Sequence, residues 1–321
     1  MSFAHDAKCE VLEAKIENEC CKLAFLSSVI HSCGELTKRG KEIYVELKTD
    51  IREVYDKVNE CLETLYGGSK ATFRLDDSNN INRSDRYIIS LPKENTNRIL
   101  FDCGIVRYNL EDDFSLLPGL DEHIIENECC LRTYVKGVFA TASTSNIVLD
   151  EGGKQHSSSG YHWEFMLVSE DFATDFSNIL FSLGISNKKS KRKNLYVIYI
   201  KEAEKVSDLL ATVGAFRNFL KLQNEMTVRE VRNNVNRQNN CINANITKTV
   251  NASVRQIAAI KKIEEKMGLD KLPDNLKELA KIRLEYPEES LENLTKLVSH
   301  PITKSGINHQ LKRILKIADK L

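Results

Sequence analysis

The sequence predicts an α+β protein in which a duplicated domain, with the element order αββαββα in each half, precedes a small all-helical domain. Three observations carry this prediction: a six-residue internal repeat, matching helix and strand periodicities after each copy, and two short amphipathic helices near the C-terminus. A length of 321 residues suggests about two domains. An apolar content of 41% with only 5 prolines indicates packed cores rather than disorder.

The repeat is the segment IENECC, which occurs at 16–21 and again at 125–130. Each copy begins an apolar helix that ends in small residues, KLAFLSSVIHSCGEL from Lys22 and LRTYVKGVFATASTSN from Leu131. Six identical residues inside matching patterns indicate a duplicated unit. We therefore expect a first domain over 1–222, with repeats at about 1–110 and 115–222.

After the first repeat helix, alternating and helical periodicities predict a hairpin, a helix, two strands and a short helix. These elements are expected at Glu35 to Leu47, turning at Arg39-Gly40-Lys41, then at Thr49 to Tyr66, Ala71 to Leu75, Tyr87 to Leu91, and near Ile99.

The second half repeats this order. Strands are expected near Ile147 and at Tyr161 to Leu167, separated by the polar loop GGKQHSSSG, followed by a helix from Ser169 to Leu183 and a strand from Leu195 to Ile200. Ser169 can cap its helix. Before the last strand, SNKKSKRKN at 186–194 holds five basic residues and no acid, which we interpret as a solvated loop, with phosphate contact as the alternative.

Small residues line both repeat helices. Ser27, Ser28, Ser32 and Gly34 in one, with Gly137, Ala140 and Ala142 in the other, would let the helices approach closely at a pseudo-twofold interface. Such a helix pair, each helix followed by a hairpin, is the plan of the LAGLIDADG homing endonucleases. LSSVIHSCG at 26–34 resembles their nine-residue motif, and VKGVFATAS at 135–143 resembles it less closely.

Nuclease chemistry on that plan needs an acid at the eighth position of each motif, the pair holding divalent metal. Those positions are Cys33 and Ala142, and neither side chain is a hard oxygen ligand. Glu35 alone would supply one carboxylate rather than a pair. We expect the fold to be kept and the nuclease lost, with no catalytic residue.

Charge is divided between the halves. Residues 185–321 contain 27 of the 46 Lys and Arg but 15 of the 46 Asp and Glu, which leaves 19 against 31 before them. A polyanion would therefore meet the second half and be repelled by the first. An electrostatic contact between the halves is the alternative.

Nine cysteines occur without a CxxC spacing or a histidine cluster, which fits buried free thiols in a reducing cytosol. Cys20-Cys21 and Cys129-Cys130 are expected to pack in the core. His162 and Glu164, with His156 nearby, favour surface positions over zinc, and Gly152-Gly153-Lys154 lacks Walker spacing. No metal or cofactor is expected. Without an apolar run of about 20 residues, no membrane segment is expected, and the location should be cytoplasmic and nucleoid-associated.

An Asn-rich stretch at 223–259 predicts a helical linker. Its apolar residues recur mostly at spacings of 3, 4 or 7, from Val228 to Ile257. A mobile linker is the alternative. The final domain, 260–321, begins with IKKIEEKMGL and continues with LPDNLKELAKIRLEYP, where Pro273 suits a first helical turn.

The segment 290–315 predicts a helix-turn-helix. Ser290 and Thr303 are N-cap candidates. The helical pattern is interrupted between them by Ser299, His300 and Pro301. One stripe of the second helix is apolar: Ile307, Leu311, Ile314, Leu315 and Ala318. The opposite side is polar or basic and lacks acids: Ser305, His309, Lys312, Arg313 and Lys316, with Lys304 and Asn308 on one flank. An ordinary amphipathic helix with a solvated face is the alternative.

The whole chain resembles the WhiA family of bacterial regulators, most specifically through NRQNNCINANITKTVNASVRQI at 236–257 and ITKSGINHQLKR at 302–313. The resemblance implies a last domain similar to the promoter-reading region of sigma factors (sigma region 4), and a role in sporulation-linked transcription, cell division or chromosome segregation. It places Thr303 to Lys316 in the major groove of double-stranded DNA, with RNA polymerase or another regulator as a further partner. Oligomeric state is not implied.

Residue roles follow for the helix that the resemblance places in the groove. Ser305, Asn308 and His309 are expected at base edges, and Lys304, Lys312, Arg313 and Lys316 at phosphates or a guanine edge. Two other functions compete with a sequence-specific regulator. One is a divergent nuclease with a targeting domain, and the other is a nucleoid or division-associated adaptor that acts mainly through protein contacts.

Overall fold

The computed structural model describes residues 2–40, 42–76, 86–108, 114–149 and 160–321. The chain divides into two compact units, Met1–Val228 and Arg229–Leu321. Lys41 of the predicted turn, the Gly152-Gly153-Lys154 loop and His156 lie outside the described residues.

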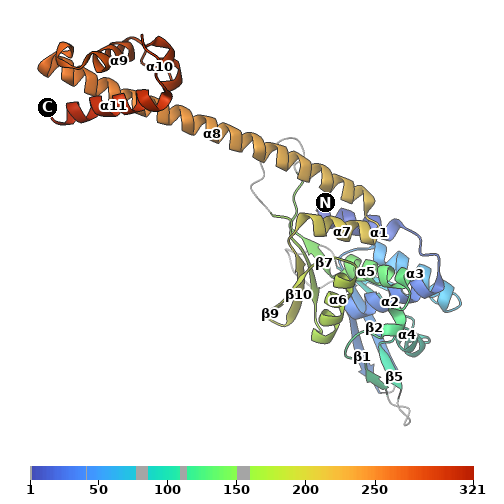
Figure 1. Ribbon diagram of the computed structural model, residues 1–321. Coiled ribbons are helices and arrows are strands. Elements are labelled where there is room, and N and C mark those ends of the chain that lie inside the picture. The colour runs from blue at the N-terminus through green and yellow to red at the C-terminus, as the bar shows by residue number, and fades with distance from the viewer. Residues whose placement is uncertain (1, 41, 77–85, 109–113, 150–159) are drawn as a thin grey trace. The chain divides into compact units, whose positions relative to one another are not determined.

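The first repeat has the predicted order αββαββα (Figure 1). Its elements are α2 (Glu19–Cys33), β1 (Gly34–Arg39), β2 (Glu42–Thr49), α3 (Glu53–Leu65), β3 (Thr72–Leu75), β4 (Tyr87–Ser90) and α4 (Thr96–Asp102). The strands form an antiparallel sheet in the order β1-β2-β4-β3. Helix α3 begins later than Thr49, because that residue still belongs to β2 and pairs with Tyr87.

The second repeat reproduces this order and topology. Its elements are α5 (Glu128–Ala142), β7 (Ser143–Ser145), β8 (Trp163–Leu167), α6 (Glu170–Ser182), β9 (Lys188–Arg192), β10 (Leu195–Ile200) and α7 (Ala203–Val213). The sheet order β7-β8-β10-β9 is equivalent to that of the first repeat. Ser169 caps α6 as predicted, its hydroxyl accepting from the Phe172 amide. Ile147, expected in a strand, lies just beyond β7 and is buried.

The basic segment before β10 is not a loop, so that prediction was wrong. Residues Lys188–Arg192 form β9, paired antiparallel with β10. Its long cations have partners within the unit: Lys189 Nζ donates to Thr174 Oγ1 at 2.8 Å, Lys191 Nζ to the Tyr196 hydroxyl at 2.9 Å, and Arg192 Nη1 pairs with Glu164 at 2.9 Å. Edge-strand lysines are tolerated because their charges face solvent and discourage further strand pairing.

Besides β9, four elements of the first unit were not predicted: α1 (Phe3–Glu13), β5 (Val106–Tyr108), β6 (Phe114–Leu116) and the 3₁₀ helix η1 (Glu122–Ile125). Helix α1 has a specific role. Its buried Glu10 carboxylate accepts from the backbone amides of Arg217 and Asn218, at 2.6 and 3.1 Å. These amides begin helix α8 (Phe216–Met267) and lack partners within the helix, so Glu10 caps it.

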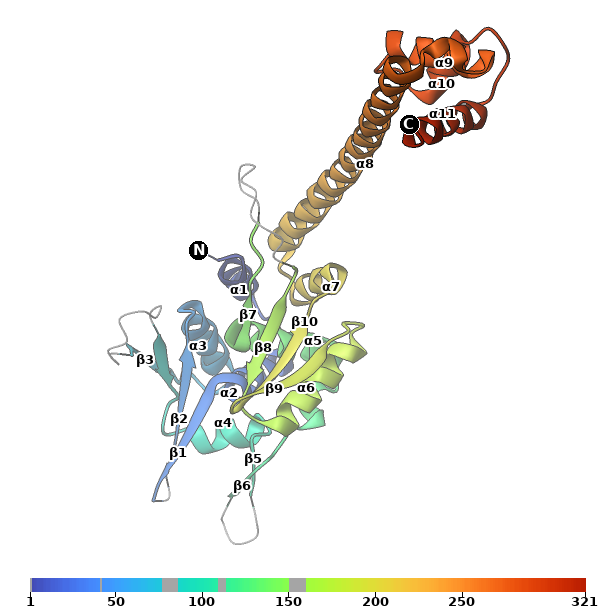
Figure 2. The same cartoon turned by 90° about the vertical axis from the view of Figure 1, so that its left-hand side faces the viewer.

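The centre of the first unit is the pair α2 and α5, which pack directly on each other (Figure 2). The predicted small residues make the contact. A Cβ at Gly137 would lie 1.7 Å from Ser28 Oγ, so only glycine allows this approach. Nearer the C-terminal ends, the Ser32 and Thr141 hydroxyls bond across the pair at 2.6 Å.

His31 of α2 is held neutral beside this interface. Its Nδ1 lies 2.9 Å from the Tyr134 hydroxyl, its ring stacks on Phe172 at 5.0 Å, and its Nε2 is buried without a partner. Burial lowers the pKa of His31 from 6.5 to about 4.

A stability difference with pH follows. Between about pH 6.5 and 4, the unfolded chain protonates His31 and the folded chain does not, so this residue reduces the free energy of unfolding progressively as pH falls through that window, by about 3 kcal/mol. We expect His31→Gln to flatten this part of the pH dependence, followed through fluorescence of Trp163, the chain's one tryptophan. If the stability of His31→Gln fell with pH as steeply as that of the wild type, the assignment to His31 would be wrong.

The His162–Glu164 pair and the two cysteine pairs differ in burial from the sequence predictions. His162 and Glu164 form a half-buried pair at 3.0 Å beside Tyr199, so they are more enclosed than the predicted surface position. The cysteine pairs are not simply core residues: Cys21 and Cys130 are buried, whereas Cys20 and Cys129 are exposed. That prediction was wrong for half of each pair, because the pairs sit at the ends of their helices rather than in the middle.

The linker is part of α8, one helix of 52 residues. Its periodic apolar residues are exposed, including Val231, Ile242 and Val254 at 58%, 55% and 60%. The periodicity therefore identified a helix but not a buried stripe. No helix in the described ranges has the length and apolar character that crossing a bilayer requires.

The second unit packs the end of α8 against α9 (Asp274–Glu285), α10 (Leu291–Leu297) and α11 (Lys304–Asp319), with a 3₁₀ turn η2 (Leu269–Lys271). Pro273 takes the N-cap position of α9, one residue before the predicted place. The core joins side chains from all four helices: Ile260, Ile263, Leu276, Leu279, Leu294, Ile307, Leu311 and Ile314.

Candidate nucleic-acid interface

Both predicted caps of the helix-turn-helix are formed. The Ser290 hydroxyl accepts from the Asn293 amide, and the Thr303 hydroxyl accepts from the Gly306 amide, each at 3.2 Å. Each cap satisfies a backbone donor that has no partner within its helix. The caps define where α10 and α11 begin, and therefore which side of each helix faces the core.

The turn between α10 and α11 is fixed to α9 by Glu278. Its carboxylate accepts from the Ser299 amide at 2.6 Å and lies 3.5 Å from His300 Nδ1. The Ser299 backbone hydrogen bond is the main cause that lowers the pKa of Glu278. A charged Glu278 thus holds the segment that sets the angle between the two helices.

One side of α11 is in the core, as its apolar stripe predicted. Ile307, Leu311, Ile314 and Ala318 are buried. Leu315, expected on the same stripe, is only half-buried, and Gln310 is buried in addition. Burial of this stripe fixes the rotation of α11 about its axis.

The other side of α11 is exposed and free of acids. Thr303, Lys304, Ser305, His309, Lys312, Arg313 and Lys316 are exposed, and Asn308 is half-buried. Over the part of the chain that the structure describes, no carboxylate pairs with Lys304, Lys312, Arg313 or Lys316. The Thr303 hydroxyl is occupied by its cap. The face combines unneutralised cations with short polar side chains near the helix N-terminus, a chemistry suited to phosphates and base edges.

Arg283 ties α9 to α8 and to the segment before α10, a role that the sequence did not predict. It is 1% exposed on α9, where Nε donates to Gln256 Oε1 at 2.9 Å and Nη1 to the Glu289 carbonyl at 2.6 Å. Burial is the main cause that lowers its pKa. A signal was present, because Arg283 follows Leu276, Leu279 and Ala280 on the same face of the helix.

The two positions where the LAGLIDADG motif carries its metal-binding acids, Cys33 and Ala142, lie at the C-terminal ends of α2 and α5. Cys33 donates to the Val29 carbonyl at 3.2 Å, and burial raises the pKa of its thiol to about 12. Ala142 is buried and offers only a methyl group. Glu35, at the start of β1, is paired with Lys48 at 2.6 Å. The two helix ends thus present a protonated thiol and a methyl group where two carboxylates would hold metal.

Family models match three segments: the WhiA N-terminal LAGLIDADG-like domain at residues 19–106, the WhiA LAGLIDADG-like domain at 131–232 and the WhiA C-terminal HTH domain at 235–318. A Clostridium botulinum protein named probable cell division protein WhiA is 37% identical over 317 residues, 96% of this chain and 97% of that protein.

A Clostridium acetobutylicum protein of the same name is 35% identical, covering 100% of this chain and 98% of its own length. The crystal structure of full-length WhiA from Thermotoga maritima shares the fold, with a TM-score of 0.58 at 22% identity, covering 100% of this chain and 99% of that one. Two LAGLIDADG-like segments followed by a helix-turn-helix domain, with full-length relatives above one third identity, show that this chain belongs to the WhiA family.

Proposed function

We propose that this protein binds specific DNA sequences through α11 and acts as a transcription regulator in cell division, chromosome segregation or sporulation, and that it has no nuclease activity. The exposed face of α11 carries the proposal, because four cations lie there without carboxylate partners among the described residues, on a helix whose other side is fixed in the core. The name of the relatives, probable cell division protein, supports the process.

Positions along α11 suggest separate roles. Ser305, Asn308 and His309 lie in its first turns, the part of a recognition helix that reaches base edges. Lys304, Lys312, Arg313 and Lys316 suit phosphates, and an arginine can also bind a guanine edge in two hydrogen bonds. Recovery of fragments from the organism's own genome by the full-length protein would identify the DNA, as a few enriched sites.

Titration with a recovered site tests the face directly. We expect Lys312→Ala with Arg313→Ala to weaken binding about 10- to 100-fold and to lower the slope of log affinity against log salt by about 1.8, since each phosphate contact contributes about 0.9. Lys281→Ala removes an exposed charge from α9 and serves as the control. Unchanged affinity and slope in the double variant would refute docking through α11.

The absence of nuclease activity is tested with the same site. The helix ends at Cys33 and Ala142 provide no acid pair, so supercoiled DNA carrying the site should stay intact with Mg²⁺ or Mn²⁺. Nicking that survives purification and follows the protein through a sizing column would favour a divergent nuclease. Diffuse DNA recovery without enriched sites would favour the adaptor function.

A further inference from the structure

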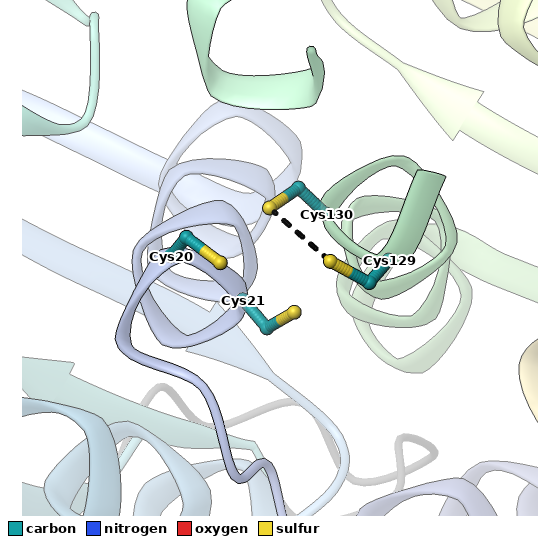
Figure 3. A group of neighbouring side chains, drawn as sticks. All are labelled: Cys20, Cys21, Cys129 and Cys130. Carbon is teal, nitrogen blue, oxygen red and sulfur yellow. Dashed lines mark hydrogen bonds between the residues drawn. The ribbon is translucent and has the colours of Figure 1, made fainter. Parts of the chain in front are cut away.

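Four cysteine sulfurs gather where α2 and α5 begin. Cys20 and Cys21 come from the first turn of α2, and Cys129 and Cys130 from the first turn of α5 (Figure 3). All four Sγ atoms lie within 4.8 Å of one another, and all four thiols are free. The side chains point into one small space, with Cys21 and Cys130 buried and Cys20 and Cys129 exposed.

The duplication explains why these residues meet. Both pairs belong to the repeated IENECC segments, so they occupy equivalent places in the two repeats. Close packing of α2 on α5, which Gly137 permits against Ser28, then brings equivalent places together. Residues more than a hundred positions apart thereby form a single cluster.

We propose that Cys20, Cys21, Cys129 and Cys130 bind one soft divalent metal ion of the zinc class, which clasps the two repeats together at the start of their central helices. This site lies about 18 Å along the helices from Cys33 and Ala142, at a rise of about 1.5 Å per residue. The metal would therefore have a structural role, separate from those two positions.

The sulfur spacing favours one ion. Zinc–thiolate bonds of about 2.3 Å in a tetrahedron place the sulfurs about 3.8 Å apart. The Cys129 and Cys130 sulfurs are already 3.9 Å apart, and the longest separation in the cluster is within 4.8 Å. Small side-chain rotations suffice to complete the tetrahedron. A cluster of several irons would need its four thiolates further apart, around a larger core.

The helix N-termini favour thiolates, whereas burial opposes them. Each pair lies in the first turn of a 15-residue helix, where the helix dipole and free amides stabilise negative charge. Lys136 on α5 lies close enough to Cys21 for the charged sulfur to raise the pKa of Lys136. Burial lowers the pKa of Lys136 by more. A hydrogen bond involving Cys21 lowers the pKa of Cys129. Burial raises the pKa values of Cys21 and Cys130, so metal binding must release protons and weaken as pH falls.

Cobalt provides the direct test. Reduced full-length protein, freed of metal by a chelator, is titrated with Co²⁺, which reports tetrahedral thiolate ligands through visible d–d bands and a thiolate-to-metal charge-transfer band. We expect these bands to saturate at one equivalent, and Zn²⁺ to abolish them. Metal analysis of protein purified without chelator should find the same stoichiometry. Absence of the bands in reduced protein would overturn the proposal.

Variants locate the ion. Cys20→Ser and Cys129→Ser change exposed positions, and we expect each to reduce Co²⁺ affinity at least about 100-fold, as loss of a ligand requires. Cys241→Ser changes an exposed cysteine of α8 and should bind Co²⁺ normally. Native Trp163 fluorescence confirms folding of every variant. Equal loss in Cys241→Ser, or retained binding in both cluster variants, would overturn the assignment.

Stability gives a second readout. Because a metal bound only to the folded state stabilises it, Zn²⁺ should raise the temperature of the Trp163 transition by about 5 °C or more, and not in Cys129→Ser. If Zn²⁺ leaves the transition of the reduced protein unchanged, and mass spectrometry finds disulfides among the four cysteines after exposure to oxygen, the cluster is a redox site and the proposal is wrong.

Discussion

Replacing Arg283 with alanine should destabilise the second unit by about 4 kcal/mol, because truncation leaves the Gln256 side-chain oxygen and the Glu289 carbonyl without donors in a buried space. Both are bound by Arg283, at 2.9 and 2.6 Å. The lost side chain also leaves a cavity among α8, α9 and the segment before α10. DNA affinity should fall with the folded fraction, since α11 depends on the same core.

Two further variants separate the causes. Arg283→Met keeps the apolar stem and removes the hydrogen bonds, and should account for most of the loss. Lys281→Ala, exposed on the same helix, should change stability by less than about 0.5 kcal/mol.

Calorimetry distinguishes the units. Tyr286 is the only aromatic residue of the second unit, so Trp163 fluorescence follows the first. The unfolding transition of the second unit should therefore appear in calorimetry without a change in Trp163 fluorescence. Its midpoint temperature should fall by about 15 °C or more in Arg283→Ala, while the midpoint of the Trp163 transition stays the same. Wild-type stability in Arg283→Met would show that the hydrogen bonds contribute little.

The parts of the fold predicted from sequence depend on local patterns. Helix periodicity, strand alternation and the Ser290 and Thr303 caps act within a few residues, and the structure confirms them. The IENECC repeat added long-range information, because a duplication implies that what holds for one half holds for the other. The repeat therefore predicted that the two halves share one element order and that their first helices pair, and the structure has two equivalent sheets around that helix pair.

The missed features depend on partners distant in sequence. The basic composition of β9 predicts a loop, because it gives no sign of the strand's pairing with β10. Charge patterns report solvent exposure, which an edge strand shares with a loop. The cysteine cluster is not predicted for a related reason: metal-binding motifs are defined by spacings within one segment, whereas the four sulfurs come from two segments related by the duplication. The exposed face of α11 was predictable because capping and amphipathicity alone determine it.

Gly137→Ala should destabilise the first unit by about 3 kcal/mol, although the same change in an exposed helix would stabilise it by about 1 kcal/mol through helix propensity. The added methyl would lie 1.7 Å from Ser28 Oγ and 3.2 Å from the Phe25 carbonyl oxygen. Rotation of the Ser28 hydroxyl cannot make enough room, because Ser28 Cβ is also only 3.0 Å from the added methyl and does not move in that rotation. Helices α2 and α5 must therefore separate.

The sign and the site of this effect are both testable. Phe139, two residues along α5, stacks on Trp163 at 5.0 Å, so Trp163 fluorescence should report the shift directly. Gly160→Ala, where a methyl meets nothing within 4 Å, is the control. Ser28→Gly combined with Gly137→Ala returns space to the interface and should recover about half the loss, a coupling that independent sites would not show. Additive effects would mean that the methyl is accommodated elsewhere, and that the close approach of α2 and α5 does not depend on these two residues.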